Sequence, residues 1–190
     1  LAIVPIYKTD EQRTAIAEVA EKLKSELEAV GHTVKFDNRD NFKPGYKFNE
    51  YEIKGVPLRI AIGPRDLENN QVEIARRDTL EKKTVALDTV TTLVPELLAE
   101  MQEQLFDRAI AYRAESTTEV DDFETFKTVL NEKGGFISAH WDGTRETEEA
   151  IKKATKATIR CLPIDGEKSA GKCVFSGKPS QQRVLFAKAY

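Results

Sequence analysis

The stretch AIVPIYKTDEQRTAIAEVAEKLKSELEAVGHTVKF, residues 2–36, decides the fold of the first part of the chain. Its first five residues form a short apolar run that is typical of a buried strand. Apolar residues then recur every three or four positions, which predicts an amphipathic helix that Thr9 and Gln12 begin as a capping box and Gly31 ends. Residues 32–36 alternate as a strand does. The stretch therefore predicts a β-α-β unit with two parallel strands.

Short helices and strands continue beyond this unit. We expect a helix over 44–54, a strand over 56–62, a turn over 63–66, strands over 72–77 and 83–87, and a helix over 92–114. Only a charged turn separates the last two strands, so they pair antiparallel at one end of a mixed sheet. The apolar side of the long helix carries Leu97, Leu98, Met101, Leu105 and Ile110. The predicted fold class for residues 1–100 is α/β, with a mixed sheet flanked by helices.

A smaller α+β domain is expected over residues 101–190. Its predicted elements are a polar loop over 115–121, a helix from Phe123 to Gly134, a strand over 136–140, a helix over 146–155, a strand over 157–162, a loop over 166–177 and a strand over 183–187. Its expected core comprises Phe136, Ile137, Trp141, Ile151, Leu162, Phe175 and Val184.

Composition limits the classes of function. A chain of 190 residues with 40% hydrophobic and 32% charged residues is expected to fold. Because the net charge is −3, any nucleic-acid site must be a local patch. No apolar run approaches the roughly 20 residues that cross a bilayer, so we expect a cytoplasmic protein without membrane contact. The two cysteines are expected to be reduced, and the start at Leu1 rather than methionine indicates a piece of a longer protein.

The run PGYKFNEYEIKGVPLR at residues 44–59, followed by GPRDLE at 63–68, resembles the anticodon-binding domain of prolyl-tRNA synthetases of the archaeal and eukaryotic-like type. The resemblance continues through residues 71–78, 157–163 and 186–190, and it covers essentially the whole chain. It implies the anticodon-binding fold of class II aminoacyl-tRNA synthetases, followed by a small C-terminal domain.

The resemblance also implies a function. This chain would recognise the anticodon of proline tRNA, while a catalytic core upstream of Leu1 attaches proline using ATP and magnesium. The piece itself would hold no catalytic residue and no cofactor, and would be inactive alone. The full-length parent would be a homodimer, and the tail at residues 188–190 would dock on the catalytic domain.

Carried over by position, Phe48 would offer a ring on which an anticodon base stacks. Glu52, Arg59, Arg65 and Asp66 would read the two guanines, because carboxylates accept from guanine N1–H and N2–H while an arginine fork donates to O6 and N7. Lys82 is the nearest match to a basic residue in the turn after the fourth strand, with Glu81 as the alternative occupant.

Simpler interpretations stand beside these roles. Taken alone, Phe48 on an amphipathic helix is more often a core residue than a stacking platform. Arg65 with Asp66 would ordinarily be a surface ion pair. The basic pairs at 76–77 and 82–83 would be a solvated hairpin end.

The C-terminal domain of many relatives holds a structural zinc on four cysteines. The matching positions here are Asp142, Thr147, Cys173 and Ser176. Since structural zinc needs four thiolate or imidazole ligands, we expect no bound metal. His140 is the one nearby imidazole and is expected to be a packed or surface residue, and Cys161, outside the zinc set, a buried apolar residue.

Two other classes of function were weighed. A flavodoxin-like enzyme is disfavoured because residues 5–10, after the first strand, contain no glycine to cradle a phosphate. The chain also offers only two histidines and no nucleophile–base motif. A stand-alone regulatory or RNA-binding paralogue without synthetase activity remains the alternative.

Overall fold

The computed structural model describes residues 1–164, 166 and 168–189, and it divides the chain into two compact units, 1–106 and 107–190. The division falls inside helix α4 (Val90–Glu115). The tail that the resemblance docks on a catalytic domain ends at Tyr190, which lies outside the described residues.

The first unit is a five-stranded mixed sheet in the order β2-β1-β3-β4-β5. Its elements are β1 (Ala2–Pro5), α1 (Asp10–Ala29), β2 (Lys35–Phe36), α2 (Pro44–Ile53), β3 (Leu58–Ile62), α3 (Pro64–Glu68), β4 (Gln71–Arg76), β5 (Lys82–Ala86), a 3-10 turn η1 (Leu87–Thr89) and α4. Strand β1 is parallel to β2 and β3, whereas β4 is antiparallel to β3 and β5. The predicted fold class and the β-α-β unit are confirmed.

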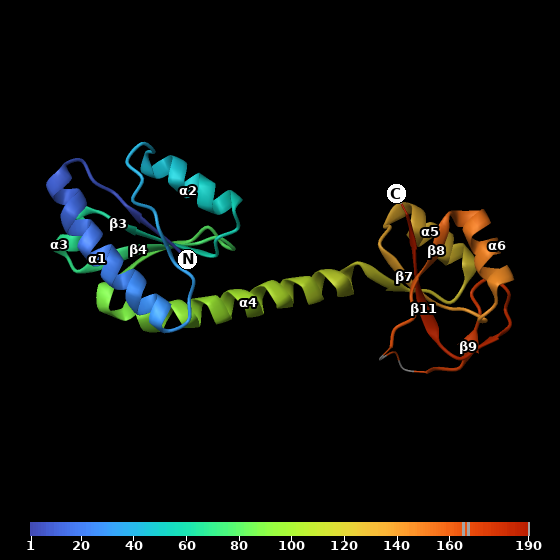
Figure 1. Cartoon of the computed structure of the whole chain (residues 1–190). Helices are drawn as coiled ribbons and strands as arrows, with labels where there is room; N and C mark the ends of the chain where they lie inside the picture. The colour runs from blue at the N-terminus through green and yellow to red at the C-terminus, as the bar shows by residue number, and fades with distance from the viewer. Residues whose placement is uncertain (165, 167, 190) are drawn as a thin grey trace. The chain divides into compact units, whose positions relative to one another are not determined.

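Helices cover both faces of the central strands β1 and β3, whereas the edge strand β5 is largely exposed. Strand alternation sends Ile3 to one face, where α1 and the first turns of α4 cover it, and Ala2 and Val4 to the other, where α2 packs through Tyr51 (Figure 1). Helix α1 begins as expected, because Thr9 Oγ1 accepts from the N–H of Gln12 at 3.3 Å. The return bond of Gln12 goes to the N–H of Lys8 instead of that of Thr9.

The second unit has a four-stranded sheet in the order β6-β7-β11-β8. Its elements are β6 (Thr117–Glu119), α5 (Phe123–Glu132), β7 (Phe136–His140), α6 (Arg145–Thr155), β8 (Ala157–Cys161), β9 (Gly171–Lys172), β10 (Pro179–Ser180) and β11 (Arg183–Lys188). Strands β9 and β10 form a separate short hairpin. The core joins α5 to the sheet through Phe126 and Phe186, whose rings meet edge to face at 5.3 Å.

Several expectations about the elements are wrong. The expected turn at 63–66 is the start of α3, because Pro64 takes the first helical position and the Asp66 carboxylate accepts from the N–H of Gly63. The expected loop at 115–121 contains β6, and the loop at 166–177 contains β9. Neither short strand has the apolar alternation that marks a strand in sequence.

Some residues assigned to the core are exposed instead. Residues 102–115 of α4 are all exposed, so Leu105 and Ile110 extend the apolar stripe beyond the part of the helix that packs on the sheet. In the second unit Phe136, Leu162 and Phe175 are exposed. Cys161 is an exposed free thiol, whereas Cys173 is buried and free. Throughout the described part of the chain, no helix has the length and apolar character needed to cross a membrane.

Candidate nucleic-acid interface

A concave pocket of about 220 Å³ lies between α2, β3 and the β4–β5 hairpin. Its walls are Phe48, Tyr51, Glu52, Val56, Arg59, Ala75, Arg76, Arg77, Leu80 and Lys82. Four of the six residues singled out in the sequence therefore converge: Phe48, Glu52, Arg59 and Lys82. They come from three different elements: the pairing of β3 with β4 and of β4 with β5 positions Arg59 and Lys82, and the packing of α2 on the sheet adds Phe48 and Glu52.

Arg59 lies flat against Phe48, with its guanidinium carbon 3.5 Å from the ring centroid. Arg59 therefore covers one face of the Phe48 ring. The Phe48 side chain also packs against the small core cluster of Ala2, Val4 and Tyr51. Phe48 thus combines the core role with support of the pocket. Burial lowers the pKa of Arg59, opposed by the charges of Glu73 and Glu52, yet a guanidinium stays protonated at neutral pH.

The Nη1 atom of Arg59 is buried without a hydrogen-bond partner among the described residues. Nη1 forms an ion pair with Glu73 Oε1, but the two atoms are 3.7 Å apart, which is too long for a hydrogen bond. A buried donor without an acceptor is costly. An acceptor supplied by a ligand would relieve that cost.

Arg77 and Lys82 complete the positively charged side of the pocket. Arg77 donates from Nε to the carbonyl oxygen of Glu52 at 2.8 Å, which ties the hairpin to the end of α2. Arg76 is engaged by Asp78 and Glu100 at 2.9 Å each, whereas no carboxylate in the described ranges pairs with Arg77 or Lys82. Two cations therefore line the pocket without a direct ion pair among the described residues, although the Glu52 carboxylate lies in the same wall.

Sequence reasoning treated residues 76–77 as a solvated hairpin end and did not consider Leu80. That residue is 66% exposed at the tip of the hairpin and has a φ of +61°, an uncommon backbone conformation for a residue other than glycine. Lys82 lies at the pocket, whereas Glu81 lines a different hollow beside α4. Adjacent residues of a strand point to opposite faces, which explains the difference.

Arg65 and Asp66 are not among the residues that line the pocket. Both lie on α3, after the end of β3. The Asp66 carboxylate accepts from the N–H of Gly63 at 2.9 Å, so it caps its own helix. Within the described residues the two side chains form no ion pair with each other, so the expected surface pair is absent there.

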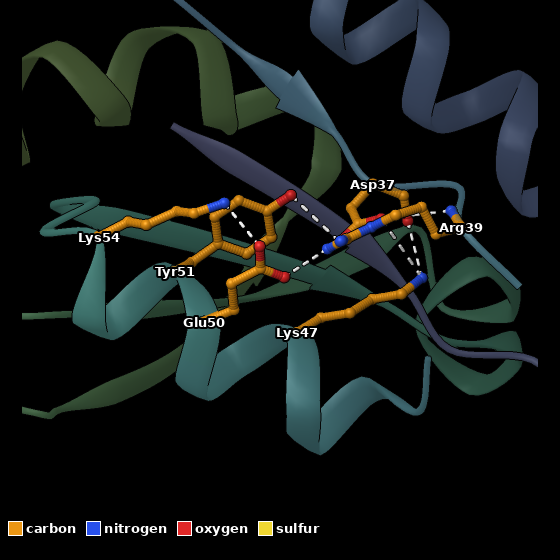
Figure 2. Close-up of polar contacts among 6 residues, drawn as sticks. All are labelled: Asp37, Arg39, Lys47, Glu50, Tyr51 and Lys54. Carbon is orange, nitrogen blue, oxygen red and sulfur yellow. Dashed lines mark hydrogen bonds and ion pairs between the residues drawn. The ribbon is translucent and has the colours of Figure 1, made fainter. Parts of the chain in front are cut away.

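A charged network fixes α2, the helix that carries Phe48 and Glu52. Figure 2 shows Lys47, Glu50 and Tyr51 of α2 reaching toward the segment after β2, which bears Asp37 and Arg39, and Lys54, the residue that caps the end of α2, contacting Glu50. Asp37 is fully buried and receives Arg39 Nε at 2.8 Å, Arg39 Nη2 at 2.7 Å and the Tyr51 hydroxyl at 3.1 Å.

The network extends from the buried Lys47 to Glu50 and Lys54, which lie nearer the surface. Lys47, only 2% exposed, donates to the carbonyl oxygen of Asp37 at 2.9 Å. Glu50 accepts from Arg39 Nη2 at 2.5 Å and from Lys54 at 2.6 Å. A buried lysine and aspartate are retained because each has its partners. Sequence reasoning missed this network, although Lys47 and Tyr51, four residues apart, share one helix face.

The electrostatics of the network favour its ionised form. Burial raises the pKa of Asp37, but the hydrogen bonds from Arg39, the charge of Lys47 and the hydrogen bond from Tyr51 outweigh it and hold the pKa at about 2. Burial and the charge of Asp37 raise the pKa of Tyr51 to about 12. Asp37 is therefore ionised and Tyr51 protonated at neutral pH, so α2 is held by fixed charges.

An arginine plane on an aromatic ring, with unpaired cations beside it, is the type of site that takes bases of single-stranded RNA. The comparisons with known proteins agree. The family described as "Anticodon binding domain" matches residues 1–97, just over half of the chain, and the chain belongs to this family. The family described as "Prolyl-tRNA synthetase, C-terminal" matches residues 123–190.

Curated proline–tRNA ligases match this chain over its whole length. A proline–tRNA ligase of Christiangramia forsetii is 60% identical over 190 residues, and one of Porphyromonas gingivalis is 57% identical. Both matches cover 100% of this chain but only 39% and 38% of the relatives, so the chain corresponds to part of such an enzyme. The crystal structure of prolyl-tRNA synthetase from Cryptosporidium parvum, complexed with L-proline and AMP, matches with a TM-score of 0.88 and 33% identity. That match covers 100% of this chain and 40% of the other.

Proposed function

We propose that the first unit binds the anticodon loop of proline tRNA in the pocket between α2 and the β4–β5 hairpin. The observation that carries the proposal is the convergence of Phe48, Glu52, Arg59 and Lys82 on one pocket. These residues were selected by resemblance to a family, and the pocket is a separate property of the structure.

The pocket suits guanine. Arg59 can donate to O6 and N7, and the Glu52 carboxylate can accept from N1–H and N2–H. Because Arg59 covers one face of Phe48, we assign stacking on the guanidinium plane to a neighbouring base of the loop, not to the guanine whose edge Arg59 contacts, with Phe48 supporting the guanidinium from behind. Arg77 and Lys82 would contact phosphates, and Arg65 and Asp66 on α3 would contact a second nucleotide of the loop.

The activity of the parent follows as a further part of the proposal. An upstream catalytic core would attach proline to tRNA using ATP and magnesium, in a homodimer working in the cytoplasm. Residues 1–100 would serve as the anticodon-binding domain and residues 101–190 as the C-terminal domain. The archaeal and eukaryotic-like type is supported by the match of the whole chain to the C. parvum enzyme, although relatives at higher identity include bacterial ones.

The test is fluorescence titration of the chain with a labelled proline-tRNA anticodon stem-loop, beside a loop whose two guanines are replaced by adenines. We expect preference for the guanine loop. An arginine–guanine contact contributes about 1–3 kcal/mol of discrimination, so Arg59→Gln should reduce the preference roughly 5- to 150-fold.

Arg108→Gln is the matched control, because Arg108 is exposed on α4 and is not among the residues that line the pocket. Equal binding of both loops by the wild type would contradict anticodon reading by this chain. Equal loss in both arginine variants would contradict the assignment of the pocket.

A further inference from the structure

Three of the four positions that match zinc ligands in relatives are joined by hydrogen bonds in the second unit, and the fourth, Cys173, lies in the same turn as Ser176. Asp142 follows β7, Thr147 lies in the first turn of α6, and Cys173 and Ser176 lie in the turn between β9 and β10. The spacings, four residues between Asp142 and Thr147 and two between Cys173 and Ser176, fall within the range of zinc-ligand pairs.

Three of these positions meet at one carboxylate. Thr147 Oγ1 donates to Asp142 Oδ2 at 2.8 Å, and Ser176 Oγ donates to the same oxygen at 2.6 Å. The other oxygen, Oδ1, accepts from the Thr144 N–H at 3.1 Å and from Thr144 Oγ1 at 2.8 Å. The Asp142 carboxylate therefore joins the start of α6 to a turn 34 residues further along the chain.

This donor set does not fit structural zinc. A closed zinc site needs four thiolate or imidazole ligands, and here two positions carry neutral hydroxyls that already donate to Asp142. The nearby imidazole, His140, is buried with Nδ1 3.2 Å from Ser180 Oγ, and a Cβ at Gly171 would overlap its ring. In the ranges that the structure describes, no three His, Cys, Asp or Glu side chains are grouped to hold a metal ion.

We propose that the Asp142 carboxylate, held by Thr144, Thr147 and Ser176, replaces the metal as the tie between α6 and the β9–β10 turn, and makes this unit stable without zinc. Thr144 is the N-cap residue of α6, yet its side chain makes no cap hydrogen bond and binds Asp142 instead. Thr147 is buried with its hydroxyl on the carboxylate. Both side chains serve the tie.

The charge state is consistent with this role. Burial raises the pKa of Asp142, but the hydrogen bonds from Ser176, Thr147 and Thr144 outweigh it and hold the pKa at about 2. The carboxylate is therefore ionised at neutral pH, and hydrogen bonds to a charged acceptor are the stronger kind.

The tie is tested by urea unfolding of the whole chain, followed by the fluorescence of Trp141. This is the single tryptophan, and its indole N–H donates to the Thr144 carbonyl at 3.1 Å. Asp142→Asn and Ser176→Ala should each lower the urea midpoint by roughly 0.5–1 M. The double variant should fall by less than the sum, because both changes remove one interaction. Ser169→Ala, at an exposed serine ahead of β9, should leave the midpoint unchanged.

Zinc content and sensitivity to a chelator test whether the second unit is stable without metal. Wild-type protein should carry far less than one zinc per chain by elemental analysis, and chelator should leave its midpoint unchanged. The triple variant Asp142→Cys, Thr147→Cys, Ser176→Cys, together with the native Cys173, should bind one zinc per chain under reducing conditions and become sensitive to chelator.

Two results would overturn the proposal: stoichiometric zinc in the wild type with a chelator-sensitive midpoint, or single variants no different from Ser169→Ala. A triple variant that binds no zinc, folded or not, would refute the convergence of the four positions.

Discussion

Replacing Asp37 by asparagine is expected to destabilise the first unit severely. The substitution preserves shape but removes the charge that receives two arginine nitrogens and the Tyr51 hydroxyl. It also leaves the Lys47 ammonium, 3.7 Å from Asp37 Oδ1 and 2% exposed, without its carboxylate. Removing one partner of a buried ion pair costs about 3–5 kcal/mol, a large share of the roughly 5–15 kcal/mol that stabilises a typical domain.

The assay is urea unfolding followed by two signals. Ellipticity reports both units, whereas the fluorescence of Trp141 reports the second unit. For an m-value of about 2 kcal/mol per M, the expected loss moves the midpoint of the first unit down by about 2 M. The Trp141 transition should stay in place. The control is Asp40→Asn, because the pair of Asp40 with Arg13 is exposed and 3.5 Å long, and exposed pairs contribute roughly 0–1 kcal/mol.

Two outcomes would refute this reasoning. If Asp37→Asn shifts the midpoint no more than Asp40→Asn does, the network does not hold α2. If the Trp141 transition moves by the same amount as the ellipticity, the effect is not confined to the first unit.

Three other predictions concern pH, backbone and salt. Because the folded pKa of Asp37 is about 2, below its usual 3.8, its ionisation adds about 2.4 kcal/mol of stability, which is complete above about pH 4 and is lost as the pH falls from 4 through 2. The difference in stability between wild type and Asp37→Asn, measured by urea unfolding, should narrow by about that amount over this window, and a constant difference would contradict the shift. Gly135→Ala should destabilise the second unit by about 1–3 kcal/mol more than Gly143→Ala, because both glycines have positive φ but only a Cβ at Gly135 would overlap the Ser116 carbonyl oxygen. Equal thermal unfolding midpoints for the two variants would show that Ser116 moves aside. Arg77→Gln should reduce the slope of log affinity against log salt by about 0.7 for a single-stranded loop and leave the preference for guanine unchanged; a lost preference would make Arg77 a base contact.

The β-α-β unit, the mixed sheet and most element bounds were predictable because they follow apolar periodicity and caps. The pocket was reached only through the resemblance, since strand pairing and the packing of α2 on the sheet together bring Glu52, Arg59 and Lys82 to one place from positions up to 30 residues apart. The position of Arg59 on Phe48 is a tertiary contact that no local pattern encodes. The Asp37 and Asp142 networks were missed because polar residues become visible as structural ties only when their partners are placed.

Photocrosslinking would test the central claim most directly. A stem-loop carrying 6-thioguanosine at each anticodon guanine in turn is irradiated with the chain, and the crosslinked peptides are identified by mass spectrometry. The account predicts that at least one guanine attaches to peptides of α2 or the β4–β5 hairpin, and that Arg59→Gln weakens that attachment. Attachment only to peptides of the second unit, or equal attachment in Arg59→Gln and Arg108→Gln, would contradict it.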